Sequence, residues 1–127
     1  MSQYPFDATM SLIEERFKDP DFCTKTLCHE IGVSISTLHE VLSVRHGTTP
    51  HMLIETRRLC EALELIRYGQ FTLGAVVNAC GFASMRTFRR VFKKRIGLPP
   101  SKVTGRLRNL SDPFYAECLR KLLAAGK

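Results

Sequence analysis

The sequence predicts an all-α fold in which two similar helical units are joined by a long linker helix and followed by a C-terminal helix. Apolar residues recur at the spacing of amphipathic helices, and no segment has a convincing strand pattern. Residues 34–50 also resemble residues 84–100, with six identities in seventeen positions. This repeat aligns caps, apolar positions and terminating glycines, which indicates an internal duplication. The identical pairs are Ser34/Ser84, Thr37/Thr87, Val41/Val91, Arg45/Arg95, Gly47/Gly97 and Pro50/Pro100.

Three helices are expected in the first unit. The first covers residues 6–17 and ends before an Asp-Pro-Asp sequence, which breaks helices. Either Thr24 or Thr26 caps a second, short helix, which ends at Gly32. Ser34 caps the third helix. The residues expected to face the core are Met10, Ile13, Phe17, Leu38, Val41 and Leu42.

A longer helix is predicted between the two copies. It begins at Thr49-Pro50, where proline is tolerated in the first turn, and ends at Tyr68-Gly69. The segment from His51 to Tyr68 would measure about 27 Å at roughly 1.5 Å per residue. That length is close to the roughly 34 Å between successive major-groove faces of duplex DNA. A helix of this length can hold two DNA-reading units one helical turn apart.

The second unit repeats the pattern of the first. A short helix over Leu73–Cys80 ends at Gly81, and a helix over residues 84–96 begins at its cap Ser84. A short segment, Ser101–Leu107, closes this unit. A last helix is expected over residues 112–125, with Gly126 as its stop. The predicted division of the chain is therefore 6–48, 49–69, 70–108 and 109–127.

Positive charge is concentrated in one third of the chain. The formal net charge is +7, but residues 1–70 sum to −3, residues 71–110 to +9 and residues 111–127 to +1. Residues 71–110 contain nine Lys and Arg and no Asp or Glu. Charge of one sign gathered in this way favours a polyanionic partner.

The helix over residues 84–96 combines an apolar back with a cationic front. Phe88, Val91 and Phe92 fall on one side, and the basic residues fall on the other. A helix, a glycine turn and a basic amphipathic helix together indicate a DNA-reading helix-turn-helix. The plainer interpretation is a charged face that only contacts solvent. The expected basic front consists of Arg86, Arg89, Arg90, Lys93 and Lys94.

Several other classes of protein are disfavoured. No apolar run approaches the roughly 20 residues needed to span a membrane, and the N-terminus does not resemble a secretory signal. The five cysteines form no CxxC pair, which is typical of free thiols in a reducing cytoplasm. The four histidines lack metal-ligand spacing, and no catalytic motif is present, so we expect no metal, no cofactor and no enzyme activity.

The segment CGFASMRTFRRVFKKRIGLPPSK resembles the signature of the AraC/XylS family of bacterial transcription regulators. RRLCEALELI is similar to the linker helix of that family, and LCHEIGVSISTLHEVLSVRHG to its first helix-turn-helix. The resemblance covers about residues 8–108. It implies two helix-turn-helix units in adjacent major grooves on one face of DNA, usually activating transcription through contact with RNA polymerase. Most members also carry an effector domain, so the chain resembles small stand-alone members or an excised DNA-binding half.

The resemblance also implies which residues contact DNA. In the second recognition helix the base readers would be Met85, Arg86, Thr87 and Arg90. Arg89 is a further expected DNA contact, and Lys93 and Lys94 are expected to touch phosphate because they lie toward the end of the helix. The first recognition helix offers no firm positive charge, so we expect the second to supply most of the affinity. The candidate contacts of the first helix are Ile35, Ser36, His39, Glu40 and Ser43.

Two alternatives remain open at this stage. The acid-leaning first half and the apolar C-terminal helix are also compatible with a module that docks RNA polymerase or another regulator and binds DNA weakly. The apolar stripe of the 112–125 helix must be covered either by this chain's own core or by a second copy in a homodimer. The stripe consists of Phe114, Tyr115, Cys118, Leu119, Leu122 and Leu123.

Overall fold

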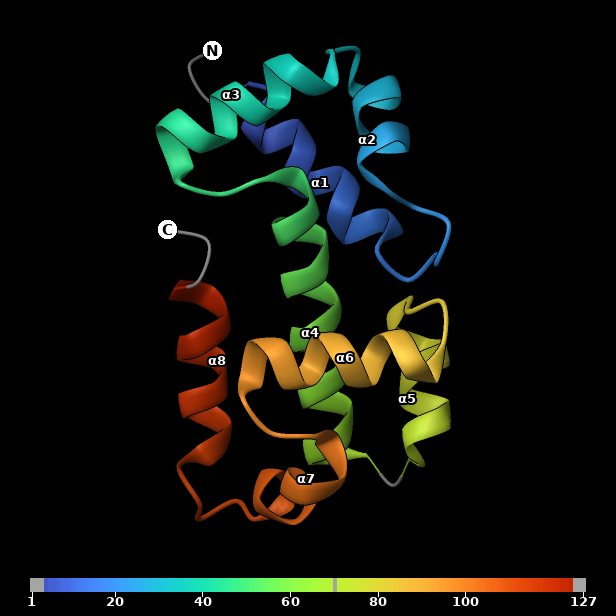
Figure 1. The fold of residues 1–127 in the computed structure, drawn as a ribbon, viewed down its shortest axis with the longest axis vertical. Helices are drawn as coiled ribbons and strands as arrows, with labels where there is room; N and C mark the ends of the chain where they lie inside the picture. The colour runs from blue at the N-terminus through green and yellow to red at the C-terminus, as the bar shows by residue number, and fades with distance from the viewer. Residues whose placement is uncertain (1–3, 70, 125–127) are drawn as a thin grey trace.

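The computed structural model describes residues 4–69 and 71–124, and the regular structure of these residues is entirely helical. The predicted all-α fold is therefore confirmed. A central helix, α4, separates a group of three helices at one end from a group of three at the other, and α8 lies beside the second group (Figure 1). We call α1–α3 the first head and α5–α7 the second head. The helices are α1 (Phe6–Arg16), α2 (Thr24–Ile31), α3 (Ile35–His46), α4 (Pro50–Tyr68), α5 (Leu73–Cys80), α6 (Met85–Ile96), α7 (Pro100–Arg108) and α8 (Phe114–Ala124).

Hydroxyl caps begin α3 and α6 as the sequence predicts, and α4 also has one. The Oγ of Ser34 accepts a hydrogen bond from the backbone N–H of Thr37 at 3.1 Å, and the Oγ of Ser84 accepts one from Thr87 at 3.1 Å. Thr49 caps α4 in the same way, and Pro50 occupies its first turn. Each cap satisfies an N–H group that has no partner within the helix.

The cap predicted for α2 is wrong. Neither Thr24 nor Thr26 occupies the N-cap position, because Cys23 does, with extended backbone angles. Phe22, directly before this N-cap, is buried in the core of the first head. The Sγ of Cys23 lies 3.7 Å from the hydroxyl of Thr26.

The last two helices depart slightly from their predicted limits. α7 begins at Pro100 and ends at Arg108, one residue beyond the predicted segment at each end. α8 begins at Phe114, where the carboxylate of Asp112 accepts the backbone N–H at 3.0 Å. The predicted end of this helix at residue 125 and its stop at residue 126 lie outside the described residues.

The buried apolar residues form two separate cores along α4. The first contains residues of α1, α2 and α3 together with Ile54 of α4. The second contains residues of α5, α6 and α7 together with Leu59, Leu63 and Ile66 of α4. The stripe of α8 joins the second core, where Phe114, Cys118 and Leu122 are buried. The chain itself therefore covers this stripe, although Leu123 is 60% exposed.

Candidate nucleic-acid interface

α6 has the two faces that its sequence predicts. Phe88, Val91, Phe92 and Ile96 are buried in the second core. The opposite side is exposed and carries five positive charges within twelve residues. The exposed cations are Arg86, Arg89, Arg90, Lys93 and Lys94.

These five cations lack partners within the part of the chain that the structure describes. None of their side chains forms a hydrogen bond, ion pair or ring contact with a residue of 4–69 or 71–124. Arg95 differs, because it is buried and its guanidinium donates to the carboxylate of Glu55 at 2.7 Å. Unpaired arginine and lysine on one helix face provide donors for an anionic partner.

Met85 and Thr87 are less accessible than the arginines beside them. Met85 is half-buried against the second core. Thr87 is also half-buried, and its hydroxyl accepts a hydrogen bond from the Oγ of Ser84 at 3.1 Å. Among the predicted base readers of α6, Arg86 and Arg90 are therefore the two that are exposed.

α3 presents an exposed surface of different chemistry. Leu38 and Leu42 are buried in the first core and hold the helix against α1 and α2. All five predicted contact residues of this helix are exposed, but they include one carboxylate and no lysine or arginine. They are Ile35, Ser36, His39, Glu40 and Ser43.

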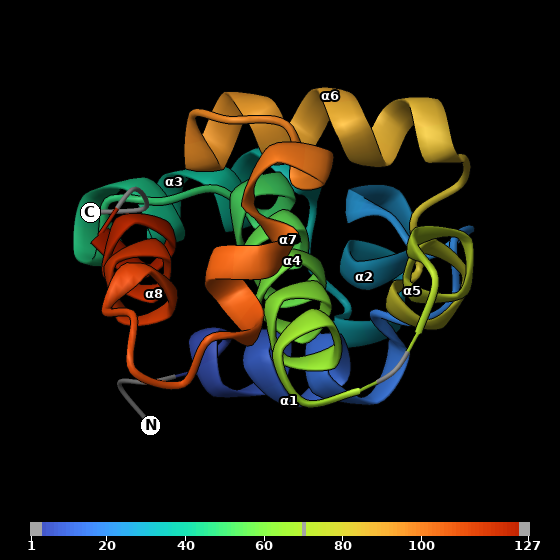
Figure 2. The ribbon, with the colours of Figure 1, turned by 90° about the horizontal axis from the view of Figure 1, so that it is seen from below.

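The two recognition helices border the same face of α4. Figure 2 shows α3 and α6 on the side of α4 that lies away from α1. One hollow on this face is bordered by Arg90 and Lys94 of α6, and a neighbouring hollow by Ile35 and His39 of α3. The two hollows share four lining residues and so form one concave region, with α4 as part of its floor. The shared residues are Pro20, His51, Ile54 and Arg58.

Sequence reasoning did not assign His51 and Arg58 to this face. His51 has a side chain that is 75% exposed, and Arg58 donates to the carbonyl oxygens of Phe17, Asp19 and Phe22. Both residues belong to α4, which the sequence presents only as a connecting helix. No local pattern reveals that a linker residue faces the space between two recognition helices, because that depends on how both heads pack.

Among residues 4–69 and 71–124, no group of three or more His, Cys, Asp or Glu side chains is arranged to hold a metal ion. Burial raises the pKa of Cys80 to about 12 and that of Cys118 to about 11, so both thiols stay protonated near neutral pH. In the same described residues, no helix is both long and apolar enough to cross a membrane.

Comparison with known proteins identifies the family. Residues 27–106, more than half of the chain, match a family model described as a helix-turn-helix domain. The chain is also similar to the HTH-type transcriptional activator RhaS of Salmonella schwarzengrund (strain CVM19633), with 26% identity over 94 residues. The chain belongs to the AraC/XylS family of transcription regulators. This relationship confirms the predicted class, a DNA-binding regulator rather than an enzyme.

The match to RhaS covers 74% of this AraC/XylS-family chain and 34% of the relative, so the chain spans about a third of the length of that relative. The RhaS protein of Salmonella arizonae (strain ATCC BAA-731 / CDC346-86 / RSK2980) is 24% identical over the same length. Two solved structures share the fold at low identity. The C-terminal domain of AraT, a response regulator from Geobacillus stearothermophilus, has a TM-score of 0.72 and 20% identity, covering 80% of this chain and 81% of that one. The C-terminal domain of the response regulator yesN from Fusobacterium nucleatum has a TM-score of 0.72 and 19% identity, covering 81% and 96%.

Proposed function

We propose that this chain binds double-stranded DNA in a sequence-specific manner, with α3 and α6 in adjacent major grooves. The main support is that the two recognition helices border one concave face, and that α6 carries five exposed cations without partners among the described residues. An α-helix fits the major groove, where each base pair presents a distinct set of donors and acceptors. α6 supplies most of the affinity, because none of the five candidate contact residues of α3 is a lysine or arginine.

The roles of individual residues follow from their chemistry. Arg86 and Arg90 are the strongest candidates for reading guanine, whose O6 and N7 accept two hydrogen bonds from one guanidinium. Lys93, Lys94 and Arg89 neutralise phosphates, while Met85 and Thr87 contact base edges at the start of the helix. On α3, the exposed hydroxyl, imidazole and carboxylate groups discriminate between sequences without adding much charge. Those groups belong to Ser36, His39, Glu40 and Ser43, with Ile35 as an apolar contact.

Selection of bound sites from random duplex DNA tests this function directly. We expect a motif with two half-sites about one helical turn apart, the stronger one read by α6. Affinity should fall steeply as salt concentration rises, because each phosphate contact releases counterions. Recovery of a single short half-site would contradict binding through two heads, and a flat salt dependence would contradict DNA binding as the main activity.

We further propose that binding activates transcription through contact with RNA polymerase in a bacterial cytoplasm, at the nucleoid. The support is that the curated relatives are named transcriptional activators. Transcription in vitro from a promoter carrying the selected site, with purified polymerase, would test this. An increase in transcript that requires the site supports activation, whereas a decrease shows repression.

A docking module with weak DNA binding is the second candidate. The observations that favour it are two exposed apolar side chains on α3, Ile35 at 46% and Val44 at 78%, and the net charge of −3 of residues 1–70. A homodimer through the 112–125 helix is a further candidate, supported by the exposed Leu123. DNA affinity that is weak at every salt concentration, together with retained polymerase binding, would favour the docking module.

A further inference from the structure

A short segment of α4 lies between the two cores and holds polar contacts to both heads. Ile54 belongs to the first core and Leu59 to the second, so residues 55–58 form the junction. On the side of the first head, Arg57 donates to the carboxylate of Glu14 in α1 at 2.7 Å. Arg58 donates to the carbonyl oxygens that follow α1. Hydrogen bonds from Arg57 and Arg58 therefore hold the first head against this junction.

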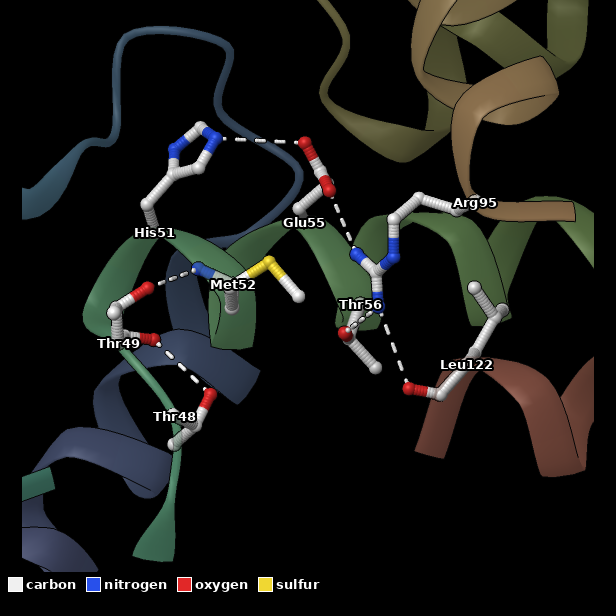
Figure 3. Close-up of polar contacts among 8 residues, drawn as sticks. All are labelled: Thr48, Thr49, His51, Met52, Glu55, Thr56, Arg95 and Leu122. Atoms are coloured by element: carbon white, nitrogen blue, oxygen red, sulfur yellow. Dashed lines mark hydrogen bonds and ion pairs between the residues drawn. The ribbon is translucent and has the colours of Figure 1, made fainter. Parts of the chain in front are cut away.

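One buried arginine of the second head, Arg95, donates hydrogen bonds to the same junction. Arg95, at the C-terminal end of α6, donates through Nη1 to the Oε1 of Glu55 at 2.7 Å and through Nη2 to the Oγ1 of Thr56 at 2.8 Å (Figure 3). The same Nη2 donates to the carbonyl oxygen of Leu122 in α8 at 3.4 Å. Only 5% of the Arg95 side chain and 7% of the Glu55 side chain are exposed. Three helices, α4, α6 and α8, thus meet at one guanidinium.

Both carboxylate oxygens of Glu55 have partners. The Oε2 lies 3.4 Å from the Nε2 of His51, one turn earlier in α4 (Figure 3). A buried charge is tolerated when its hydrogen-bonding capacity is filled, and a fork of donors such as that of arginine has a fixed direction. The geometry of this cluster therefore restricts how the end of α6 can lie on α4.

The start of α6 is held at a second point. The turn before α6 contains Gly81, and a Cβ atom on this glycine would overlap the carbonyl oxygen of Phe17 in the first head. Figures 1 and 2 both show the α5–α6 turn and α8 on opposite sides of α4. Contacts near both ends of α6 thus oppose tilting of this helix relative to the first head.

We propose that Arg95 and Glu55 are positioning residues that set the spacing between the two half-sites this protein accepts. The inference rests on the proposed function, since it assumes that both heads engage DNA. Two linked heads gain avidity only when the geometry allows simultaneous engagement. Adding one base pair between half-sites moves the second by about 3.4 Å and rotates it by about a tenth of a turn. Because both heads are held at residues 55–58, they cannot move and rotate enough to contact both half-sites at the altered spacing.

Replacing only Arg95 or only Glu55 is a poor test, because it leaves an uncompensated buried charge. The resulting loss of stability would occur whether or not the pair sets the half-site spacing. The double change Glu55→Leu/Arg95→Met replaces the pair by apolar side chains of similar size and removes the directional contacts to Thr56 and Leu122. Thermal unfolding establishes first that the variant is folded. Arg106→Met is the matched control, because it breaks an exposed ion pair with Asp112 that lies outside the α4 junction.

Binding is measured on the selected two-half-site duplex, on duplexes with one base pair added or removed between the half-sites, and on a duplex keeping only the α6 half-site. For the unchanged chain and the Arg106→Met control, we expect affinity to fall at least about tenfold when the spacing changes. For the double variant, the fall should shrink to about threefold or less, with affinity for the single half-site within about twofold of the unchanged chain. A purely structural role would instead lower binding to all four duplexes alike.

The outcomes separate the inference from the function on which it rests. A folded double variant that keeps the original spacing preference overturns the positioning role and leaves the two-headed function intact. An unchanged chain that binds the single half-site as tightly as both overturns the function and the inference together. Should the double variant fail to fold, Thr56→Val removes one acceptor of Arg95 with little change of shape. A folded Thr56→Val chain with an unaltered spacing preference would likewise overturn the positioning role.

Discussion

Gly81 of the second head lies directly against the backbone of Phe17 in the first head. A Cβ atom at position 81 would overlap the carbonyl oxygen of Phe17 and come within 3.0 Å of the Arg58 Nε. Gly81 also has a φ of +87°, in the left-handed region that favours glycine. This residue therefore ends α5 and permits close packing between the heads.

Gly81→Ala should destabilise the protein far more than the same change at Gly32. Gly32 has a similar φ of +78°, but a Cβ atom there would meet nothing within 4 Å, so this position isolates the cost of the backbone conformation. We expect Gly32→Ala to lower the free energy of unfolding by about 1–2 kcal/mol. Gly81→Ala should cost about 2–3 kcal/mol more, because the two heads must move apart. Chemical denaturation measures both, and equal losses would show that the contact with Phe17 contributes nothing.

Arg90→Ala should reduce sequence discrimination as well as affinity. Loss of a guanidinium that reads guanine costs about 1–3 kcal/mol at one base pair and relaxes the preference there. Lys93→Ala and Lys94→Ala should instead weaken binding to all sequences alike and lower the slope of log affinity against log salt concentration. Competition binding with a panel of single-base variants measures the difference. An equal loss of affinity of Arg90→Ala for every duplex would assign this arginine to phosphate.

Glu40→Gln tests whether α3 enters a groove. A carboxylate near DNA is repelled by phosphates, and two unit charges about 4 Å apart in water interact by about 1 kcal/mol. Removing that charge should tighten binding by about two- to fivefold at low salt and by less at high salt, where screening is stronger. Titrations at several salt concentrations check this. Unchanged affinity throughout would place α3 outside the groove.

Leu122→Ala should destabilise the second head, because Leu122 is 1% exposed in the second core. A cavity of this kind costs about 2–4 kcal/mol of unfolding free energy, whereas Leu123→Ala at the 60% exposed neighbour should change it by no more than about 0.5 kcal/mol.

Sedimentation should show one monomeric mass at all concentrations. A mass that rises with concentration and is restored to the monomer by Leu123→Asp would support the homodimer through the 112–125 helix.

Acid should loosen the contact between α1 and α4. Hydrogen bonding from Arg57 lowers the pKa of Glu14 below its ordinary value, so the stabilisation is present above that ordinary value and is lost as pH falls through the lowered pKa. The Glu14 side chain is 63% exposed, which limits the effect to below about 1 kcal/mol. Glu14→Gln should therefore reduce the loss of stability between neutral and acid pH, measured by denaturation across that range. Glu15→Gln is the control. An identical pH dependence of stability in both variants would show that Glu14 does not cause the loss of stability in acid.

Local chemistry in the sequence determined the helices and much of the candidate interface. Ser34 and Ser84 cap the helices that they were predicted to cap, because a cap bonds to an N–H group only three residues away. The two faces of α6 follow from side-chain spacing along one helix, so its exposed cations were also predictable. Glycine turns at positions 32 and 81 belong to the same class of short-range signal.

Tertiary packing decided the features that join distant parts of the chain. Arg45 and Arg95 occupy equivalent positions of the repeat, yet Arg45 is exposed and Arg95 is buried against Glu55, forty residues earlier. The N-cap of α2 is likewise Cys23, next to the buried Phe22, rather than either of the predicted threonines. Whether a charged side chain is exposed or buried depends on what the rest of the chain brings beside it. The sequence therefore predicted α3 and α6, and only tertiary contacts, among them those of residues 55–58 and of Gly81, decided how these helices are held relative to each other.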